Sequence, residues 1–303
     1  MGKNLIMRNQ KKAYLFALLA ILFWSTMSSA FKLTLNYIDT TNLLLFASIT
    51  SLLILFLVLV FTKQVNQLKG LQLKYILNSA FLGALNPFAY YLILFEAYNL
   101  LKAQIAGTLN YFWPIVLVIL SIPILKQKIS YKSLIAIFIS FLGIIIISTE
   151  GSLKSLESNN LIGIALAVGS ALFWALYWIF NVKDQRPEIS KLFLNFVFGT
   201  IYIFIYISLF KSFTLPSENA IIGSIYIGLF EMGLTYIFWL KALKFSTNTA
   251  KVSNLVYLSP FIALLIIRIT LGEQILLTTF IGLIFIIGGI ILQKYIDKPN
   301  LII

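Results

Sequence analysis

Residues 161–181, LIGIALAVGSALFWALYWIFN, decide the class of fold, because these 21 positions carry no charged side chain. A helix needs about 20 apolar residues to cross the hydrocarbon core of a bilayer. Nine further stretches of similar length are predominantly apolar, so the sequence predicts an all-α membrane protein with ten transmembrane helices. The expected spans are 13–32, 42–62, 75–97, 103–125, 132–149, 161–181, 191–211, 220–241, 248–268 and 275–294.

The composition of the whole chain excludes most other classes of protein. Its 303 residues are 60% hydrophobic and only 11% charged, whereas a soluble domain carries about a quarter charged residues. Cysteine and histidine are both absent, which removes the thiolate and imidazole ligands of most metal sites and the usual acid-base group of hydrolases. We therefore expect no catalytic residues, no bound metal and no cofactor, and a protein that is not an enzyme.

The positive charges indicate how the spans are oriented. Of the 23 Lys and Arg residues, 18 fall in the two termini and in alternate gaps between spans; the opposite side holds Lys32, Lys102, Lys154, Lys211 and Arg268. Positive loops stay in the cytoplasm. This bias predicts cytoplasmic N and C termini in a multi-pass protein of the plasma (inner) membrane. The net charge of +13 is thus assigned to topology and anionic lipids, and no nucleic-acid partner is expected.

An internal repeat divides the chain. Leu22-Phe23-Trp24 recurs as Leu172-Phe173-Trp174, Tyr91 recurs as Tyr236, and Tyr111 with Pro114 recurs as Tyr257 with Pro260, at offsets of 145 to 150 residues. Each half holds five expected spans, an odd number, so the second half must be inverted in the membrane. Such inverted repeats are typical of secondary transporters; a duplicated scaffold without transport is the alternative. The expected segments are a cytoplasmic N-terminus 1–12, repeats 13–149 and 161–295 joined by an external linker 150–160, and a cytoplasmic tail 296–303.

One carboxylate is expected near the middle of the bilayer. Glu231 lies ten residues from Lys241 and thirteen from Glu218, and an acid at that depth usually faces a cavity or a partner. At the repeat offset of 145 it corresponds to Asn86. Glu231 is a candidate for binding a substrate ammonium group or for carrying a coupling proton. The alternative is a structural glutamate, hydrogen-bonded to Asn86, a Tyr or a Ser.

Two prolines are predicted to break the fourth and ninth helices, since proline removes a backbone donor inside a helix. Pro114 frees the carbonyl of Asn110, and Pro260 frees that of Val256. Polar and aromatic candidates for substrate binding stand beside these breaks: Asn110, Tyr111, Trp113, Asn254 and Tyr257. The alternative is a kink that only shapes helix packing.

Aromatic residues form a stripe on the sixth helix. Trp174, Tyr177 and Trp178 follow the spacing of one helical face, and Trp24 holds the related place on the first helix. These four residues are candidate walls of a cavity. An interfacial aromatic belt is the alternative interpretation.

With these motifs the sequence resembles the EamA-type drug/metabolite transporter superfamily. The shared features are an aromatic-Trp pair in the first helix of each repeat, Pro260, and Leu271-Gly272-Glu273 before a glycine-rich last helix; the first repeat has Leu125-Lys126-Gln127 instead. Asn110-Tyr111-Phe112-Trp113-Pro114 is similar to the branch that includes bacterial aromatic amino-acid exporters. The resemblance implies a cavity between helices one, three, four, six, eight and nine, with helices five and ten outside.

The sequence therefore predicts a small-molecule transporter that works by alternating access from a cavity at the midplane. Aromatic or other neutral amino acids are the first candidates for an exported substrate. A nucleoside, a sugar or a cationic drug is the second possibility, and a membrane scaffold is the third. The expected partners are the substrate and membrane lipids, and a homodimer is left open.

Overall fold

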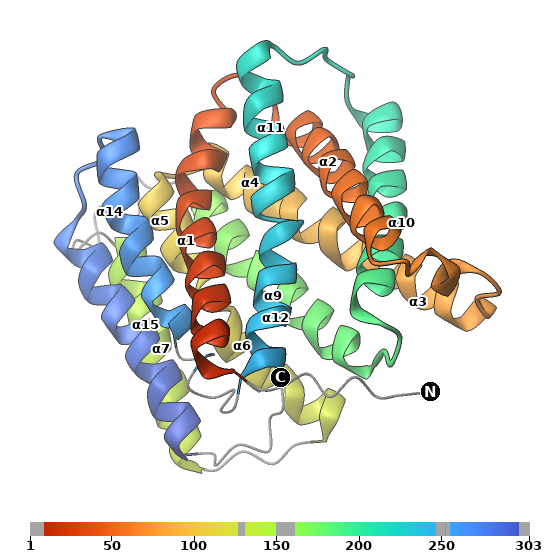
Figure 1. Cartoon of the computed structure of the whole chain (residues 1–303). Coiled ribbons are helices and arrows are strands. Elements are labelled where there is room, and N and C mark those ends of the chain that lie inside the picture. Colours follow the sequence, from red (N-terminus) through yellow and green to blue (C-terminus); the bar gives the residue numbers. More distant parts are fainter. Residues whose placement is uncertain (1–8, 127–130, 150–160, 247–251, 253–254, 297–303) are drawn as a thin grey trace.

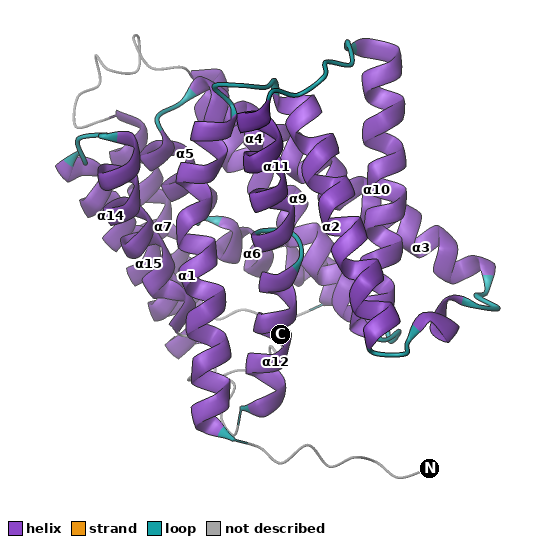
Figure 2. Ribbon diagram, turned by 45° about the horizontal axis from the view of Figure 1, so that its top comes forward, coloured by secondary structure: helices purple, strands orange, loops and turns teal. Residues whose placement is uncertain are grey.

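The computed structural model describes residues 9–126, 131–149, 161–246, 252 and 255–296. Within these residues every regular element is a helix and no strand occurs (Figure 2). The helices are α1 (Gln10–Thr34), α2 (Thr40–Phe61), η1 (Val65–Leu68), α3 (Leu73–Gly83), η2 (Ala84–Ala89), α4 (Tyr90–Leu100), α5 (Ala103–Asn110), α6 (Trp113–Leu125), α7 (Tyr131–Thr149), α9 (Leu161–Lys183), α10 (Glu188–Phe210), α11 (Glu218–Phe230), α12 (Leu234–Phe245), η3 (Leu255–Leu258), α14 (Ser259–Leu271) and α15 (Leu277–Ile296). The predicted all-α class is confirmed.

Seven helical segments are long and apolar enough to cross a membrane: 10–34, 40–61, 73–100, 103–125, 161–181, 188–210 and 218–243. They match seven of the expected spans to within a few residues. Three shorter apolar helices, Ile135–Ile147, Leu255–Leu271 and Leu277–Leu292, stand where the fifth, ninth and tenth spans were expected. The chain is a multi-pass membrane protein, and the count of ten remains a prediction for those three.

Among the described residues, three of the seven spans and the segment expected as the ninth span are interrupted. The third changes from α3 to α4 through the π-helical segment η2, where Asn86 has extended backbone angles (φ −151°, ψ 121°). The fourth is broken at Tyr111 and Phe112, between α5 and α6. The eighth is broken at residues 231–233, between α11 and α12, and the ninth changes from η3 to α14 at Ser259. Backbone groups released in this way at membrane depth are tolerated only against protein or water.

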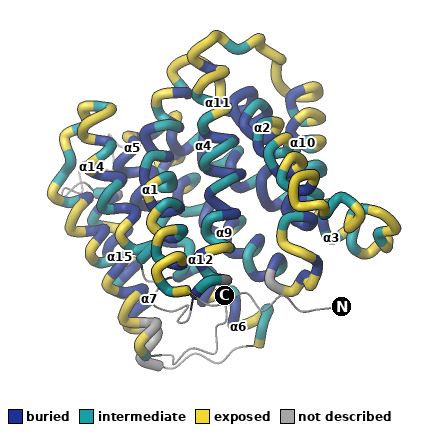
Figure 3. Tube along the Cα trace, viewed as in Figure 1, coloured by how far each residue is buried: buried dark blue, intermediate teal, exposed yellow. Residues whose placement is uncertain are grey.

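The helices are arranged around a buried centre. We call the end of the molecule where α1 begins the lower end, and the end with the α1–α2 turn the upper end (Figure 1). Burial is high along α4 and α5, in the interior of the bundle (Figure 3). Helices α7 and α15 pack against each other at one side (Figure 1), where Gly143 lies so close that an added Cβ would be 2.5 Å from the Gly282 carbonyl oxygen.

Candidate functional site

Glu231 lies at the break between α11 and α12, and its side chain points into protein. The residue is only 8% exposed. The hydroxyl of Tyr91, from α4, donates a hydrogen bond to its Oε1 atom at 3.1 Å. Its other oxygen, Oε2, is buried without a hydrogen-bond partner among the described residues. A carboxylate held in this way has one oxygen free for a further donor.

Tyrosine hydroxyls form most of the polar surroundings of this carboxylate. Five of them lie within electrostatic reach of it: Tyr90, Tyr91, Tyr98, Tyr111 and Tyr236. No basic side chain pairs with Glu231 in the described parts of the chain, where the ion pairs are Arg186–Asp184 and Lys191–Glu188. The acid therefore has neutral dipoles around it and no counter-charge.

Tyr91 and Tyr236 occupy related positions of the internal repeat, one in each half of the chain. Both are buried, at 0% and 3% exposure, and they interact with each other beside Glu231. The polar centre thus contains side chains from both halves of the chain.

Asn110 is the second polar side chain of this centre. Tyr90 donates a hydrogen bond to its Oδ1 atom at 3.2 Å, and its Nδ2 atom donates to Ser170 Oγ of α9 at 2.9 Å. Asn110 ends α5, and Pro114 stands in the first turn of α6, so the break between them exposes backbone next to the amide. Helices α4, α5 and α9 are joined at this residue.

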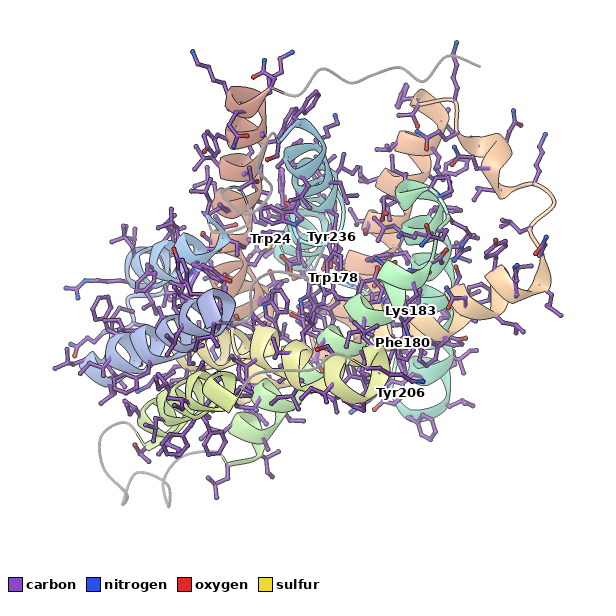
Figure 4. The ribbon with its side chains drawn as sticks, turned by 90° about the horizontal axis from the view of Figure 1, so that it is seen from below. Trp24, Trp178, Phe180, Lys183, Tyr206 and Tyr236 are labelled. Carbon is purple, nitrogen blue, oxygen red and sulfur yellow. The ribbon has the colours of Figure 1, made fainter. Side chains whose placement is uncertain are left out.

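Trp174 of α9 is the hub of an aromatic cluster. Its ring centroid lies 4.6 Å from that of Tyr90, 5.7 Å from Trp178 and 6.2 Å from Tyr236. Trp113 and Tyr177 complete the cluster at 6.4 and 6.1 Å. In the view from the lower end, Trp178 and Tyr236 lie near the middle of the molecule (Figure 4). The stripe predicted on the sixth span faces inward.

Asn86, the predicted counterpart of Glu231, lies in a different group. It is fully buried at the break in the third span, near the Tyr177 hydroxyl, and Asn195 of α10 lies on the other side of that hydroxyl. The three side chains approach one another without the geometry of a hydrogen bond, so both amides and the hydroxyl are unpaired within the described residues. The structure does not bring Asn86 into contact with Glu231.

The remaining candidates occupy the edges of the centre. Trp24 is half-buried and contacts Trp239 of α12, with ring centroids 5.5 Å apart. Tyr257 is half-buried in η3. Pro260 stands in the first turn of α14, where Ser259 pairs with Ser25 of α1 at 3.0 Å. Asn254 lies outside the described residues.

Sequence reasoning missed several residues of the centre. Tyr90, Tyr91, Tyr236 and Ser170 contact the predicted residues, and Asn195 contacts the Asn86 group. The repeat match between Tyr91 and Tyr236 was a usable signal, because residues preserved in both halves can meet where the halves join. Ser170 and Asn195 gave no such signal. Each is a single polar residue in an apolar helix and belongs to no motif or repeat match.

Polar contacts close the centre toward the upper end. Ser28 of α1 bonds the Tyr98 hydroxyl at 2.7 Å, and Lys32 Nζ donates to the carbonyls of Tyr98 and Leu101, each at 2.7 Å. Glu273 accepts hydrogen bonds from the first amides of α5, at Ala103 (2.8 Å) and Gln104 (3.2 Å). A carboxylate there also complements the positive end of the helix dipole. These contacts tie the second half to the first.

A shallow cleft of about 770 Å³ lies outside this closure, at the upper end. It is lined by the α1–α2 turn, by the end of α4 with Glu96 and Asn99, and by residues that follow α10. Burial raises the pKa of Asp39 in this cleft, but hydrogen bonds from Thr41 and Asn42 outweigh burial and hold the pKa below its ordinary value. Asp39 therefore serves as the cap of α2, at whose start its side chain accepts both amides.

Within the described residues no three acidic side chains gather where a metal ion would bind. The free carboxylate oxygen of Glu231, the Asn110 amide and the aromatic walls instead form a set of groups that can hold an organic molecule without reacting with it. A buried, polar and aromatic centre between broken helices is characteristic of a membrane carrier.

Comparison with known proteins identifies the kind of carrier. Residues 11–149 and 161–293 each match the EamA-like transporter family, so the chain belongs to that family of the drug/metabolite transporter superfamily. A transporter of Clostridium kluyveri, described as uncharacterized, is 29% identical over 95% of this chain and 94% of its own length. Transporter YyaM of Bacillus subtilis, also described as uncharacterized, is 25% identical over 78% and 79%. One solved crystal structure shares the fold, with a TM-score of 0.66 at 16% identity, covering 96% of this chain and 99% of that one.

Proposed function

We propose that this protein is a secondary transporter of the plasma (inner) membrane that exports small amphipathic metabolites by alternating access. Aromatic or other neutral amino acids are the first candidates, on the resemblance of the Asn110–Pro114 stretch. The observation that carries the proposal is the buried carboxylate of Glu231 at a break between two half-helices, where one of its oxygens has no hydrogen-bond donor and no counter-charge within the described parts of the chain. Placing such an acid in a membrane is energetically unfavourable. Binding of a positively charged group of the substrate would explain why it is there.

The proposed architecture is two inverted repeats with both termini in the cytoplasm. Two findings support it: the family match falls on two consecutive segments, and the breaks of the third and eighth spans fall at Asn86 and at Glu231, 145 residues apart. In inverted repeats the substrate site lies between broken helices near the midplane. The centre at Tyr91, Tyr236 and Glu231 has that position in our proposal.

The burial pattern favours a conformation that is open toward the lower end, the cytoplasmic one by the charge bias. Tyr91, Tyr177 and Tyr236 are buried, whereas Trp24 and Trp178 are half-buried. The contacts of Ser28, Lys32 and Glu273 close the upper end. Export then requires that these contacts open while the aromatic side chains of the lower end come together.

Glu231 is the proposed coupling residue. A carboxylate that alternates between the two faces can bind a proton on one side and release it on the other. Tyr91 would keep the carboxylate oriented during this cycle through the hydrogen bond to Oε1. The five surrounding tyrosines are neutral at physiological pH, so Glu231 is the group that changes charge.

Flux through purified protein tests the proposal. We expect proteoliposomes to exchange labelled phenylalanine or leucine faster than empty vesicles, and a proton gradient to drive net movement. Glu231→Gln should abolish the dependence on the gradient while exchange continues at saturating substrate, because the amide keeps the shape of the side chain but cannot titrate. Glu96→Gln, at the outer cleft, is the matched control and should behave as wild type. Gradient dependence that survives in Glu231→Gln would contradict the coupling role, and absence of flux for every metabolite tried would contradict transport.

A further inference from the structure

We propose that Glu231 and the aromatic residues next to it form a subsite for a protonated amine, so that the cargo must carry an ammonium group. The subsite consists of Glu231, Tyr91, Tyr236 and the rings of Tyr90, Trp174 and Trp178. This inference rests on the proposed function, since it assigns the chemical class of the cargo. It excludes sugars and other cargoes that lack an amine.

The charge balance is the first argument. Glu231 is more than nine-tenths buried, and its Oε2 atom has no hydrogen-bond donor among the described residues. When Glu231 is ionised, it needs a cation there, because burying an unpaired charge is far more costly than burying a paired one. Among the described residues no basic side chain forms an ion pair with Glu231: Arg186 and Lys191 form ion pairs at the lower end, and Lys32 binds carbonyls at the upper end. In our proposal the bound ligand supplies the cation.

The arrangement of rings is the second argument. Trp174 lies 4.6 Å from Tyr90 and 5.7 Å from Trp178, and Trp178 stacks with Tyr236 at 6.4 Å. Aromatic faces attract ammonium groups, tryptophan most strongly. The cation–π contacts of the described residues involve other rings, those of Phe16, Tyr75, Phe180 and Phe245. Among the described residues, no cation–π contact involves the rings of Tyr90, Trp174, Trp178 or Tyr236, which are packed on one another next to the Glu231 group.

The donors and acceptors of the subsite select the charge of the ligand. Tyr91 donates to Oε1, and Oε2 has no donor among the described residues; in the ionised carboxylate this free oxygen only accepts hydrogen bonds. An ammonium group supplies donors only, and it matches an acceptor flanked by aromatic faces. A carboxylate in the same place would face Glu231 as a like charge, which disfavours binding. The apolar part of the cargo then lies against the wider aromatic cluster of Trp113 and Tyr177.

Binding to the purified full-length protein tests the subsite without any need for flux. The probes are 2-phenylethylamine, 2-phenylethanol and 3-phenylpropionate, which share a ring and a short chain but differ in the polar end. Their binding can be followed by tryptophan fluorescence, since Trp174 and Trp178 belong to the subsite. We expect the amine to bind about tenfold more tightly than the alcohol, because a charge-assisted hydrogen bond is about twice as strong as a neutral one. We expect the carboxylate to bind more weakly than either.

Two variants distinguish the effect of the Glu231 charge on binding from an effect of the substitution on folding. Glu231→Gln should lower the affinity for 2-phenylethylamine about tenfold and leave that for 2-phenylethanol unchanged. Glu96→Gln is the matched control and should change neither affinity. Equal binding of the three probes by wild-type protein would overturn the inference, and this comparison requires no variant. So would an unchanged amine affinity in a folded Glu231→Gln protein.

The outcome is independent of the flux experiment. Metabolite flux in proteoliposomes without selective binding of the amine would overturn this inference but not the proposed transport. Selective amine binding by a protein that carries no metabolite would overturn the proposed function and leave the ammonium subsite in place.

Discussion

The breaks in the third and eighth spans occupy related places in the two halves but differ in chemistry. At the first break Asn86 is fully buried beside Tyr177 and Asn195, and all of these groups are neutral. At the second break Glu231 is bound by Tyr91, and its free oxygen lies in an aromatic environment. A broken helix thus occurs in both halves of the chain, whereas a buried carboxylate is present only at the second of these two breaks. In our proposal the cargo and the proton are bound at the second break, and the first break shapes the opposite wall.

The helices around the two breaks are also anchored differently at the lower end. Asn78 and Ser79 of α3 bond Asp184 and Arg186, which form a buried ion pair at 2.5 Å. The α12 side is anchored mainly by α1, where the Asn9 amide donates to the Phe245 carbonyl at 2.8 Å. The first break therefore has the firmer base, and α12 has the freer one. A moving element is expected on the less firmly held side.

The largest expected effect is on the anchor of α3. Asp184→Asn should destabilise the protein by about 3 kcal/mol, because it leaves the Arg186 charge buried without its partner. Burial raises the pKa of Asp184, but hydrogen bonds and charge from Arg186, with a hydrogen bond from Asn78, outweigh burial and hold the pKa below its ordinary value. The stabilising contribution of the wild-type carboxylate is therefore complete above about pH 4 and is lost as the pH falls through the lowered pKa.

Thermal unfolding in detergent from pH 7 down to pH 3 measures this effect. The difference between wild type and Asp184→Asn should be large at pH 7 and should shrink toward acid. A difference that stays constant with pH would show that the ion pair is not its cause. Asp39→Asn is a useful comparison, since it also removes a carboxylate whose pKa is lowered but leaves no buried cation behind.

The close helix contacts at the two breaks give the next largest effect. A Cβ added to Gly199 would lie 2.4 Å from Pro87 Cδ at the first break, and one added to Gly228 would lie 2.3 Å from the Ala47 carbonyl oxygen beside the second. Gly228→Ala and Gly199→Ala should each cost about 1–3 kcal/mol, the range for overpacking. Gly169→Ala is the matched control, because its added Cβ would meet nothing within 4 Å.

The melting temperatures of these three variants measure how rigidly the helices are packed at each break. If both breaks are rigid joints, Gly199→Ala and Gly228→Ala should melt well below Gly169→Ala. A Gly228→Ala protein as stable as the control would mean that α2 yields to the added methyl group, and the second break would then be looser than its packing indicates.

The smallest expected effect is on the hydroxyl that orients Glu231. Tyr91→Phe removes one buried hydrogen bond, worth about 1 kcal/mol, and keeps the ring. We expect an amine affinity about fivefold lower and transport that remains coupled to protons. Tyr98→Phe is the control, since its hydroxyl bonds Ser28 at the upper end. An equal loss in both variants would show that the Tyr91 hydroxyl has no special relation to the carboxylate.

Much of the fold was predictable from the sequence because hydropathy in a bilayer is a strong constraint. Runs such as 161–181 and 188–210 carry the signal over a whole span. The breaks were less predictable. Pro114 and Pro260 mark two of them, but at Glu231 the helix ends without a proline, at Met232 and Gly233, where Ser51 of α2 binds the Met232 carbonyl at 2.8 Å. That contact comes from a residue 181 positions away, so tertiary packing places this break.

The sequence identified several residues of the candidate site but not the side chains of other helices that contact them. Depth along a span identified Glu231, and helical spacing identified Trp174, Tyr177 and Trp178. Neither rule shows which side chains of other helices reach the same point. Tyr90 and Ser170 contact Asn110 only because α4 and α9 lie side by side. Asn86 and Glu231 both lie at helix breaks, but the repeat offset does not show which side chains surround each of them, and Asn86 lies near the Tyr177 hydroxyl.

The most direct test of the chamber between the halves is the accessibility of single cysteines, for which this cysteine-free chain is already a suitable background. Trp178→Cys reports on the lower side of the centre, Ser28→Cys on the upper closure, and Phe138→Cys, on the exposed outer face of α7, on lipid. With a membrane-impermeant maleimide, we predict that Trp178→Cys reacts from the cytoplasmic face and Ser28→Cys from the external face, that cargo protects both, and that Phe138→Cys stays unreactive. Failure of both Trp178→Cys and Ser28→Cys to react from either face, like the lipid control, would contradict the account.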